Sequence, residues 1–496
     1  MNIHQDELTP KFLKSLYQQN GLNIELISKL LLHEFCLLKE LESHVKNTDL
    51  KINIGLHYLS LFLNYVNAEL SSISRANIRA TIDIEKRYNI KYFNCVILEA
   101  IKYLYGYNSG KKNSIWKTKI TPISKIIDDK DFKKDFNVLD KKINELVNSN
   151  ITDREKRDLC SHYDNEPLKV YNYLIGISEE DEYQRWIRFS PILNDLLLFV
   201  NKYTKKYKVL INSNSGIDTK YLISHCDLNF STNDKNTLYY SIQESIKSYI
   251  RNLNQYVQHQ SIPEKLQKLF KNDKSDSINT LVELEKIQLQ ITYIYIDLAS
   301  ALCRFLTSEY TLERQFALKQ TNVIIYEGFN KLYSINEESY KSLWDKYVRP
   351  YTTNLSAPPI TLEFEKLTHQ LEIIKNEIKS RGNQRQMSVH FNQGIMKLYE
   401  MLHDLNPVVE ISICKHIFKL LNDVTNFLNR CMEEIKEKEK IETEKVEKER
   451  VDKIDKFIDK LQKLPDDSFK EEMIKNFMKL KSDNFLEIFL KNESKD

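Results

Sequence analysis

The sequence predicts an all-α protein made of two similar helical bundles that are followed by a charged helical arm. Three observations lead to this prediction: glycine and proline are scarce, apolar residues recur at helical spacing, and long stretches of the chain repeat at a fixed offset. At 496 residues the chain is long enough for two or more domains, each with its own hydrophobic core.

The composition is that of a globular protein with few tight turns. Only 9 residues are glycine and 10 are proline, whereas all-β folds and nucleotide-binding α/β folds need glycine for turns and phosphate loops. No G-x-x-x-x-G-K or G-x-G-x-x-G motif occurs, which argues against Walker-type and dinucleotide-binding sites. A net charge of +3 also argues against a protein that wraps a long guide RNA or coats duplex DNA.

Targeting signals and metal motifs are not evident in the sequence. The N-terminal MNIHQDELTPKF has no cationic region followed by an apolar core, and no stretch reaches about 18 uninterrupted apolar residues. We therefore expect a cytoplasmic protein with no membrane partner. The 7 cysteines are scattered and never form C-x-x-C, so buried free thiols are expected rather than disulfides or a zinc site.

An internal repeat with a constant offset determines the predicted domain organisation. The stretch IEKRYNIKYFNCVILEAIKYLYGYN (84–108) aligns without a gap with LERQFALKQTNVIIYEGFNKLYSIN (312–336). Trp116 aligns with Trp344 in the same register, and we expect both to anchor cores rather than to stack on bases. The separation of these two tryptophans in the sequence is called the repeat offset below. One ungapped register over such a long part of the chain indicates a tandem duplication.

The repeat divides the chain into four predicted parts. These are a helical domain over 1–205, a linker over 206–229, a second helical domain over 230–431 and a charged helical extension over 432–496. The extension contains many Glu/Lys pairs at i,i+4, which are typical of a solvated helix. It is either a solvated arm or an element that binds a partner protein. Within the two domains, equivalent apolar residues recur three or four positions apart, at Phe136, Leu139, Ile143 and Leu146 and at Phe364, Leu367, Leu371 and Ile374.

A pair of motifs, each an arginine followed five positions later by a histidine, is related by the same repeat offset. The first is Arg157–His162 and the second is Arg385–His390. Residues five apart point about 140° away from each other on an ideal helix, so the two side chains can converge only near a helix start. Arginine suits phosphate binding and histidine suits proton transfer, and together they fit attack of an RNA 2′-hydroxyl on its own phosphodiester. The alternative is that these are solvated residues, or that each arginine pairs with a core glutamate.

The two motifs resemble the signature of the HEPN superfamily of helical domains. In that signature an arginine, usually followed by Asn, Asp or His, precedes a histidine by four to six intervening residues. Asp158 fits the second position of the first motif, whereas Gln386 departs from it in the second motif. The resemblance covers about residues 55–205 and 283–431.

The resemblance implies a specific function. HEPN ribonucleases are metal-independent and dimeric, with both Arg/His pairs lining one composite cleft, and cleavage leaves a 2′,3′-cyclic phosphate and a 5′-hydroxyl. Many relatives act as toxins or in antiviral defence. By this resemblance, His162 and His390 are the acid/base candidates, Arg157 and Arg385 would stabilise the phosphorane, and no cofactor or metal is expected.

Two further residues are kept in both repeats inside apolar helical runs. Glu99 and Glu327 are expected either to orient the motif arginines through a buried ion pair or to be exposed or paired elsewhere. Glu85 and Glu313, fourteen positions earlier, are weaker candidates for the same role.

Three functional hypotheses follow from these patterns. The first is an endoribonuclease with a composite site formed by both domains of one chain, acting on RNA in antiviral defence or toxin-type growth arrest. The second is a catalytically inactive HEPN scaffold that binds RNA, a nucleotide or a partner protein, and Gln386 favours it. The third is a helical adaptor, which leaves the repeated Arg/His pairs unexplained. A regulatory or antitoxin protein is expected to bind through the C-terminal helices, and the oligomeric state beyond the intramolecular pair is left open.

Overall fold

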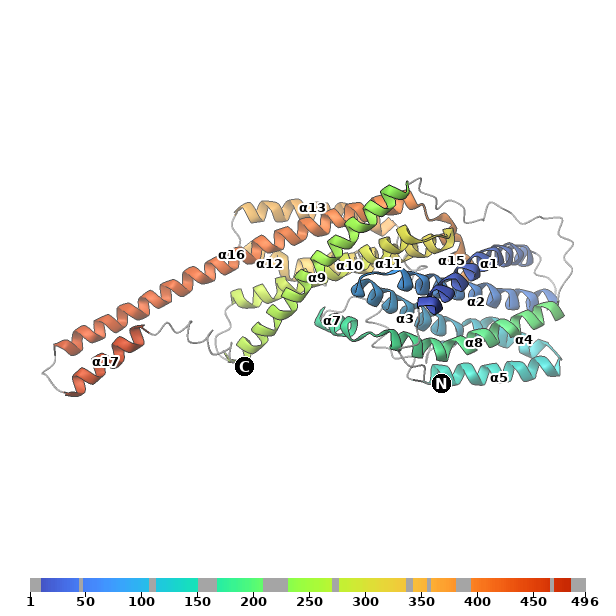
Figure 1. The fold of residues 1–496 in the computed structure, drawn as a ribbon, viewed down its shortest axis with the longest axis horizontal. Helices are drawn as coiled ribbons and strands as arrows, with labels where there is room; N and C mark the ends of the chain where they lie inside the picture. The colour runs from blue at the N-terminus through green and yellow to red at the C-terminus, as the bar shows by residue number, and fades with distance from the viewer. Residues whose placement is uncertain are drawn as a thin grey trace.

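The fold is helical throughout the part of the chain that the structure describes. The structure is a computed structural model, and its regular elements are all helices (Figure 1), which confirms the predicted all-α class. The described residues are 10–43, 48–106, 113–149, 167–207, 231–269, 276–335, 342–354, 358–380, 394–463 and 468–482.

The helices form two halves and an arm. The N-terminal half contains α1 (Pro10–Ser43), α2 (Thr48–Arg79), α3 (Asp83–Tyr105), the π-helical turn η3 (Trp116–Ile120), α4 (Thr121–Ile126), α5 (Lys130–Val147), α7 (Pro167–Gly176) and α8 (Glu179–Lys206). The C-terminal half contains α9 (Thr232–Leu269), α10 (Asp276–Thr307), α11 (Thr311–Tyr333), the π-helical turn η7 (Trp344–Val348), α12 (Arg349–Asn354), α13 (Pro358–Ser380), α15 (Ile395–Asp404) and the first part of α16 (Pro407–Gln462). The rest of α16 and α17 (Ser468–Ser482) form the arm.

The helix bounds of the two halves recur at the repeat offset. Both ends of α2, α3, η3, α4 and α7 are related by it to the ends of α10, α11, η7, α12 and α15, and the starts of α5 and α8 are related by it to the starts of α13 and α16. Fewer than about 1% of residues in globular proteins lie in π-helical turns. The presence of such a turn at the same place in each half therefore indicates that the two halves share one local architecture.

The tryptophans of these π-helical turns are core residues, as expected. Trp116 is fully buried, stacks on Phe136 with ring centroids 5.2 Å apart, and donates its indole N–H to Asp140 Oδ1 over 2.7 Å. Trp344 is also fully buried and makes the equivalent contacts, stacking on Phe364 (5.3 Å) and donating to Thr368 Oγ1 (3.0 Å).

Helix starts follow from local capping chemistry. The Asn406 side chain accepts the backbone N–H groups of Val408 and Val409, and Pro407 occupies the first helical position, where no N–H acceptor is needed. Asp129 caps α5 in the same way, accepting from the N–H groups of Asp131 and Phe132.

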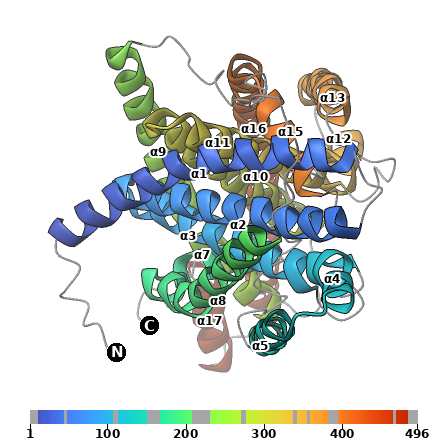
Figure 2. The same cartoon turned by 90° about the vertical axis from the view of Figure 1, so that its right-hand side faces the viewer.

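Each of the two hydrophobic cores takes in one short helix from the other half, together with buried residues of α11 or α3. In the N-terminal core, α2 packs between α1 and α3 with α8 beside it, as the end-on view shows (Figure 2). The buried residues of α15, among them Leu398 and Leu402, belong to this core, although α15 lies in the C-terminal half of the sequence. Conversely, Val170 and Leu174 of α7 belong to the core of the C-terminal half. Each half thus supplies a helix that completes the other half's core.

This exchange is energetically substantial. Five side chains of α15 are buried, and burial of a large apolar side chain stabilises by about 1.5–3 kcal/mol, so α15 alone contributes on the order of 10 kcal/mol before its ordering entropy is subtracted. The five residues are Ile395, Leu398, Tyr399, Met401 and Leu402.

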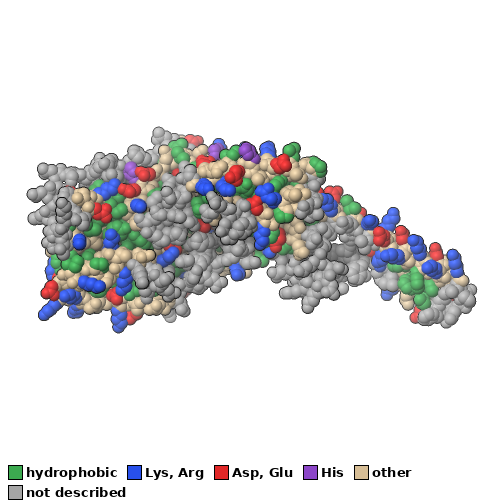
Figure 3. All heavy atoms as spheres, turned by 180° about the vertical axis from the view of Figure 1, so that it is seen from behind, with side chains coloured by type: hydrophobic (Ala, Val, Ile, Leu, Met, Phe, Trp, Pro, Cys, Tyr) green, Lys and Arg blue, Asp and Glu red, His purple; other side chains and the backbone are tan. Residues whose placement is uncertain are grey.

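The arm is a helical hairpin that projects from the body (Figure 1). The 56-residue helix α16 runs without a break through residue 431, where the second domain was predicted to end, and spans about 84 Å. Helix α17 folds back on its outer end, where Phe457 and Phe477 pack with ring centroids 4.8 Å apart. Figure 3 shows Lys/Arg and Asp/Glu side chains intermixed along the arm, as expected from its sequence.

One described helix is long and apolar enough to cross a membrane. It is the Asn279–Thr307 part of α10, and 89% of its most apolar window is buried inside the protein. Packing within the core of the C-terminal half therefore accounts for its apolar character.

Because each half completes the other's core, we predict that the two halves stay together when the chain is cut. A protease site inserted between residues 207 and 231 would allow cleavage after folding. We expect the two fragments to co-elute in size-exclusion chromatography and to separate only in denaturant. The uncut protein is the control, and fragments that elute separately without denaturant would contradict the exchange of helices.

Candidate functional site

The predicted catalytic residues lie outside the described part of the chain. Arg157, Asp158 and His162 fall within 150–166, and Arg385, Gln386 and His390 fall within 381–393. Their convergence on one cleft, and the role of Gln386, therefore stay predictions. The structure does describe the helices on either side of both segments, the glutamates expected to support them, and the contacts between the two halves.

The two supporting glutamates occupy equivalent, buried positions. Glu99 lies on α3 and Glu327 on α11, and both side chains are buried among apolar neighbours of their helices. Lys102, one turn away, places its Nζ 3.4 Å from Glu99 Oε2. The predicted ion pairs with the motif arginines remain predictions, and the alternative that these glutamates are exposed is wrong.

Each helix that follows a motif segment is anchored at its C-terminal end in the same way. The Ile177 carbonyl oxygen, just after α7, accepts from Arg87 Nη1 over 3.1 Å. The Leu405 carbonyl oxygen, just after α15, accepts from Gln315 Nε2 over 3.3 Å. Arg87 and Gln315 are equivalent residues in the first turns of α3 and α11. The C-terminal ends of both helices are therefore held in equivalent ways.

Two buried ion pairs join the halves reciprocally. Lys91 Nζ of α3 lies 2.6 Å from Asp297 Oδ2 of α10, and Lys319 Nζ of α11 lies 2.7 Å from Glu69 Oε1 of α2. The two lysines are related by the repeat offset, and so are the two carboxylates, so the second pair repeats the first with the halves interchanged. All four side chains are less than a tenth exposed.

The lysine–glutamate pair is the more deeply buried of the two. Burial lowers the pKa of Lys319, while the facing Glu69 carboxylate opposes that effect. Tyr92 also donates its hydroxyl to Glu69, so the carboxylate has two donors from two different helices. A buried pair of this kind strongly penalises the loss of either partner, because the remaining charge is left without compensation.

The halves also meet where α2 contacts the start of α11, and this contact contains a cluster of charged side chains. The equivalent contact, of α10 with the start of α3, has fewer charged residues. Between α2 and the start of α11, Arg75 donates to Glu313 over 2.7 Å and to Glu309 over 2.6 Å. The Glu309 carboxylate also accepts the Tyr17 hydroxyl over 2.6 Å, and Arg79 lies 3.6 Å from Glu313. This cluster contains two cations and two carboxylates, so its formal charge is balanced.

In the equivalent contact, between α10 and the start of α3, neutral residues stand at the positions of both cations. The residues related by the repeat offset to Arg75 and Arg79 are Cys303 and Thr307, and the residue equivalent to Glu309 is Thr81. Only Glu85, the equivalent of Glu313, is kept. It receives a hydrogen bond of 3.5 Å from Gln243 Nε2, which also donates to Thr81 and Tyr239.

Glu85 is consequently a buried carboxyl group without an adjacent cation among the described residues. Burial raises its pKa from the ordinary 4.5 to about 7, against smaller opposing effects of the Gln243 hydrogen bond and the more distant Arg79 charge. This carboxyl is therefore partly protonated near neutral pH, where an ordinary glutamate is ionised.

The interface lysines do have a signal in the sequence. Lys91 and Lys319 are kept at equivalent positions of two helical repeats, and a lysine that is buried is almost always paired. The weaker candidates for orienting the motif arginines, Glu85 and Glu313, have other partners among the described residues. Glu313 pairs with Arg75 and Glu85 accepts from Gln243, and any contact with the motif arginines stays a prediction.

Comparisons of this chain with models of protein families, with curated proteins and with solved structures find no match.

We predict that the raised pKa of Glu85 makes stability depend on pH. Its folded pKa of about 7 exceeds the unfolded value of 4.5, so its contribution to stability is fully present below about pH 4.5 and is lost as pH rises through about 7. A pKa difference of this size corresponds to about 3 kcal/mol. Relative to the wild type, the free energy of unfolding of Glu85→Gln should therefore rise by up to about 3 kcal/mol between pH 4.5 and 8, measured by urea unfolding.

Glu313→Gln is the matched control and should be destabilised at pH 7, because it removes the partner of Arg75. A stability difference between Glu85→Gln and wild type that does not change with pH would contradict this assignment.

We predict that breaking the Lys319–Glu69 pair destabilises the protein strongly. Lys319→Met leaves Glu69 buried and should lower the free energy of unfolding by about 3–5 kcal/mol. Lys29→Met is the control, because its pair with Glu25 is 73% and 53% exposed and should change stability by less than about 1 kcal/mol. Adding Glu69→Gln to Lys319→Met should recover most of the loss, since it removes the unpaired charge and keeps an acceptor for Tyr92. If Lys319→Met unfolds at the wild-type urea concentration, the pair is not important for stability.

Proposed function

We propose that the chain is a metal-independent endoribonuclease of the HEPN type whose active site is completed by its two halves. Arg157 and His162 would supply one half of the site, and Arg385 and His390 the other. The biological role that fits best is antiviral defence or toxin-type growth arrest. This proposal rests on the repeated motif and on the way the described helices pair.

The observation that supports the proposal most directly is the exchange of the two helices that follow the motifs. Helix α7 follows the first motif and packs into the C-terminal core, and α15 follows the second and packs into the N-terminal core. The reciprocal pairs Lys91–Asp297 and Lys319–Glu69 reinforce the same arrangement. A symmetric dimer is built from reciprocal contacts of this kind, and here one chain supplies both partners.

The proposed chemistry requires no oxidant and no second substrate. One histidine would accept the proton of an RNA 2′-hydroxyl as its oxygen attacks the adjacent phosphorus. The bond from phosphorus to the 5′-oxygen then breaks, and that oxygen takes a proton from the other histidine. The arginines would stabilise the charge on the phosphorane oxygens. The products are a 2′,3′-cyclic phosphate and a 5′-hydroxyl.

A catalytically inactive HEPN scaffold is the second candidate function. Gln386 favours it, because the position after the motif arginine usually carries Asn, Asp or His in this superfamily. In that case the chain would bind RNA, a nucleotide or a protein without cleaving RNA. Under either function, we propose that the arm formed by α17 and the outer part of α16 binds a regulatory or antitoxin protein, and that the chain acts in the cytoplasm.

We predict RNA cleavage that persists in EDTA and depends on both histidines. Purified protein should be incubated with total RNA in EDTA beside His162→Ala, His390→Ala and the double variant. Each single variant should lose at least about 100-fold in cleavage rate, because acid and base act in one step. New ends should accept phosphate from a polynucleotide kinase without prior phosphatase treatment, as 5′-hydroxyl ends do.

The control for this experiment is His416→Ala, which replaces an exposed histidine on α16 and should cleave at the wild-type rate. Binding of RNA without cleavage by the wild type, in EDTA or with added metal, would support the scaffold instead. Full activity in the double variant would exclude the proposed site.

A further inference from the structure

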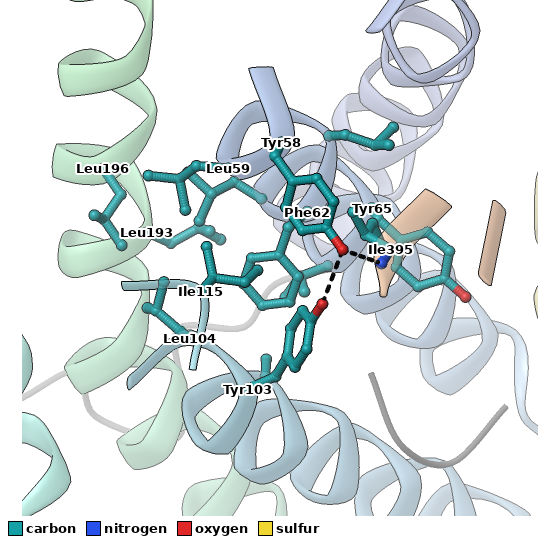
Figure 4. Packing of buried hydrophobic residues seen from close by; sticks show 14 of the residues in the cluster. Tyr58, Leu59, Phe62, Tyr65, Tyr103, Leu104, Ile115, Leu193, Leu196 and Ile395 are labelled. Carbon is teal, nitrogen blue, oxygen red and sulfur yellow. Dashed lines mark hydrogen bonds between the residues drawn. The ribbon is translucent and has the colours of Figure 1, made fainter. Parts of the chain in front are cut away.

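The start of α15 depends on a side chain from the other half of the chain. The first N–H groups of a helix have no acceptor within the helix and need one from elsewhere. At α15 the residue before the helix is Gly394, which has no side chain that could serve as a cap. The Ile395 N–H instead donates to the Tyr58 hydroxyl of α2 over 3.1 Å (Figure 4).

The Tyr58 hydroxyl is held in place by a second tyrosine. Tyr103 Oη of α3 lies 3.2 Å from Tyr58 Oη, and Figure 4 shows both rings among buried apolar residues of the N-terminal core. Burial raises the pKa of both tyrosines, so both hydroxyls stay neutral over the physiological pH range. The Lys119 ammonium group lies 4.8 Å from the centre of the Tyr58 ring and further restricts it. The acceptor for Ile395 is therefore fixed in position.

Gly394 is required for this close approach. Its φ is +97°, a region that residues with a side chain rarely adopt. A Cβ at this position would also lie only 2.7 Å from Tyr58 Oη. The backbone of α15 is thus fitted to the tyrosine of the other half.

Among the described residues, no equivalent tyrosine cap is found at the start of α7. Helix α7 begins at Pro167, which has no N–H to satisfy and is well suited to the first position of a helix. The residues equivalent to Tyr58 and Tyr103 are Lys286 and Lys331, whose ammonium groups cannot accept a hydrogen bond. In the part of the chain that the structure describes, the tyrosine cap is therefore found at α15 and not at α7.

The remaining length of α15 is also held by the N-terminal half. Tyr399 packs on Phe35 of α1 with ring centroids 4.7 Å apart, and Glu400 pairs with Lys39 over 2.6 Å. The start of α15 is therefore fixed relative to α1, α2 and α3 rather than only to the half of the sequence that contains it.

We infer that Tyr58, supported by Tyr103, is a positioning residue for the second half of the proposed site. His390 precedes Ile395 by five residues in the sequence, so the capped position directly follows the second motif along the chain. The N-terminal half thus determines where the chain emerges from the segment that carries Arg385 and His390. This inference rests on the proposed ribonuclease function.

The test compares Tyr58→Phe with the wild type in the full-length protein. Phenylalanine keeps the ring packing and removes the acceptor. We expect kcat for RNA cleavage in EDTA to fall about 10- to 100-fold with KM unchanged, because a small displacement of a catalytic group lowers the rate of the chemical step. Hydrogen exchange of a peptide covering 394–402 should become faster in this variant.

The matched control is Tyr293→Phe, which removes the hydroxyl of another fully buried tyrosine, on α10. It should leave both kcat and exchange of the 394–402 peptide unchanged. Gly394→Ala is a second variant that disturbs the same contact from the other side, and its kcat should fall as well. Loss of activity that only parallels a loss of thermal stability in all three variants would overturn the positioning role.

The two proposals can fail separately. An active wild type with unchanged kcat in Tyr58→Phe, despite faster exchange of the 394–402 peptide, overturns the positioning role and leaves the ribonuclease intact. A wild type that does not cleave RNA overturns both.

Discussion

The reciprocal pairing of the two halves is the constraint on which the rest of the structure depends. Lysines from α3 and α11 reach carboxylates on α10 and α2, and both ion pairs are buried. Burying a charge is costly unless its partner is in place, so these pairs penalise any placement of the halves that separates the lysines from the carboxylates. The exchanged helices α7 and α15 then fill the cores that this placement creates. The ion pairs contribute to the specific placement of the two halves, and burial of apolar side chains contributes most of the stability of the pairing.

The pairing is not a perfect repetition. Where one contact between the halves has Arg75, Arg79 and Glu309, the equivalent contact has Cys303, Thr307 and Thr81, so neutral side chains stand in place of these three charges. Similarly, α7 begins with proline whereas α15 begins with a backbone N–H that a tyrosine must accept. In each case the difference on one helix is matched by a compatible difference on its neighbour. Two halves of one chain can differ in this way, whereas identical subunits of a homodimer carry the same residues at both sites.

Much of the fold could be predicted from the sequence because its signals are local and periodic. Few glycines, a helical apolar spacing and a fixed repeat offset led to an all-α chain, and the two tryptophans were correctly expected to anchor cores. The exchange of α7 and α15 could not be predicted, because an apolar face does not reveal which core it enters. The Tyr58 contact with Ile395 was also inaccessible, since it joins residues 337 positions apart and involves a backbone group. Of the candidate site, burial of Glu99 and Glu327 is established, and the arrangement of the motif residues remains a prediction.

The continuity of α16 has a mechanical consequence. Its first part contributes Val424 and Phe427 to the core of the C-terminal half, and the same helix continues without interruption to Gln462 at the far end of the arm. A helix of this kind behaves as a stiff rod rather than as a tether. A force applied at the tip of the hairpin would therefore be transmitted along the helix as a torque. That torque would act on the packed core of the C-terminal half, tens of ångströms away.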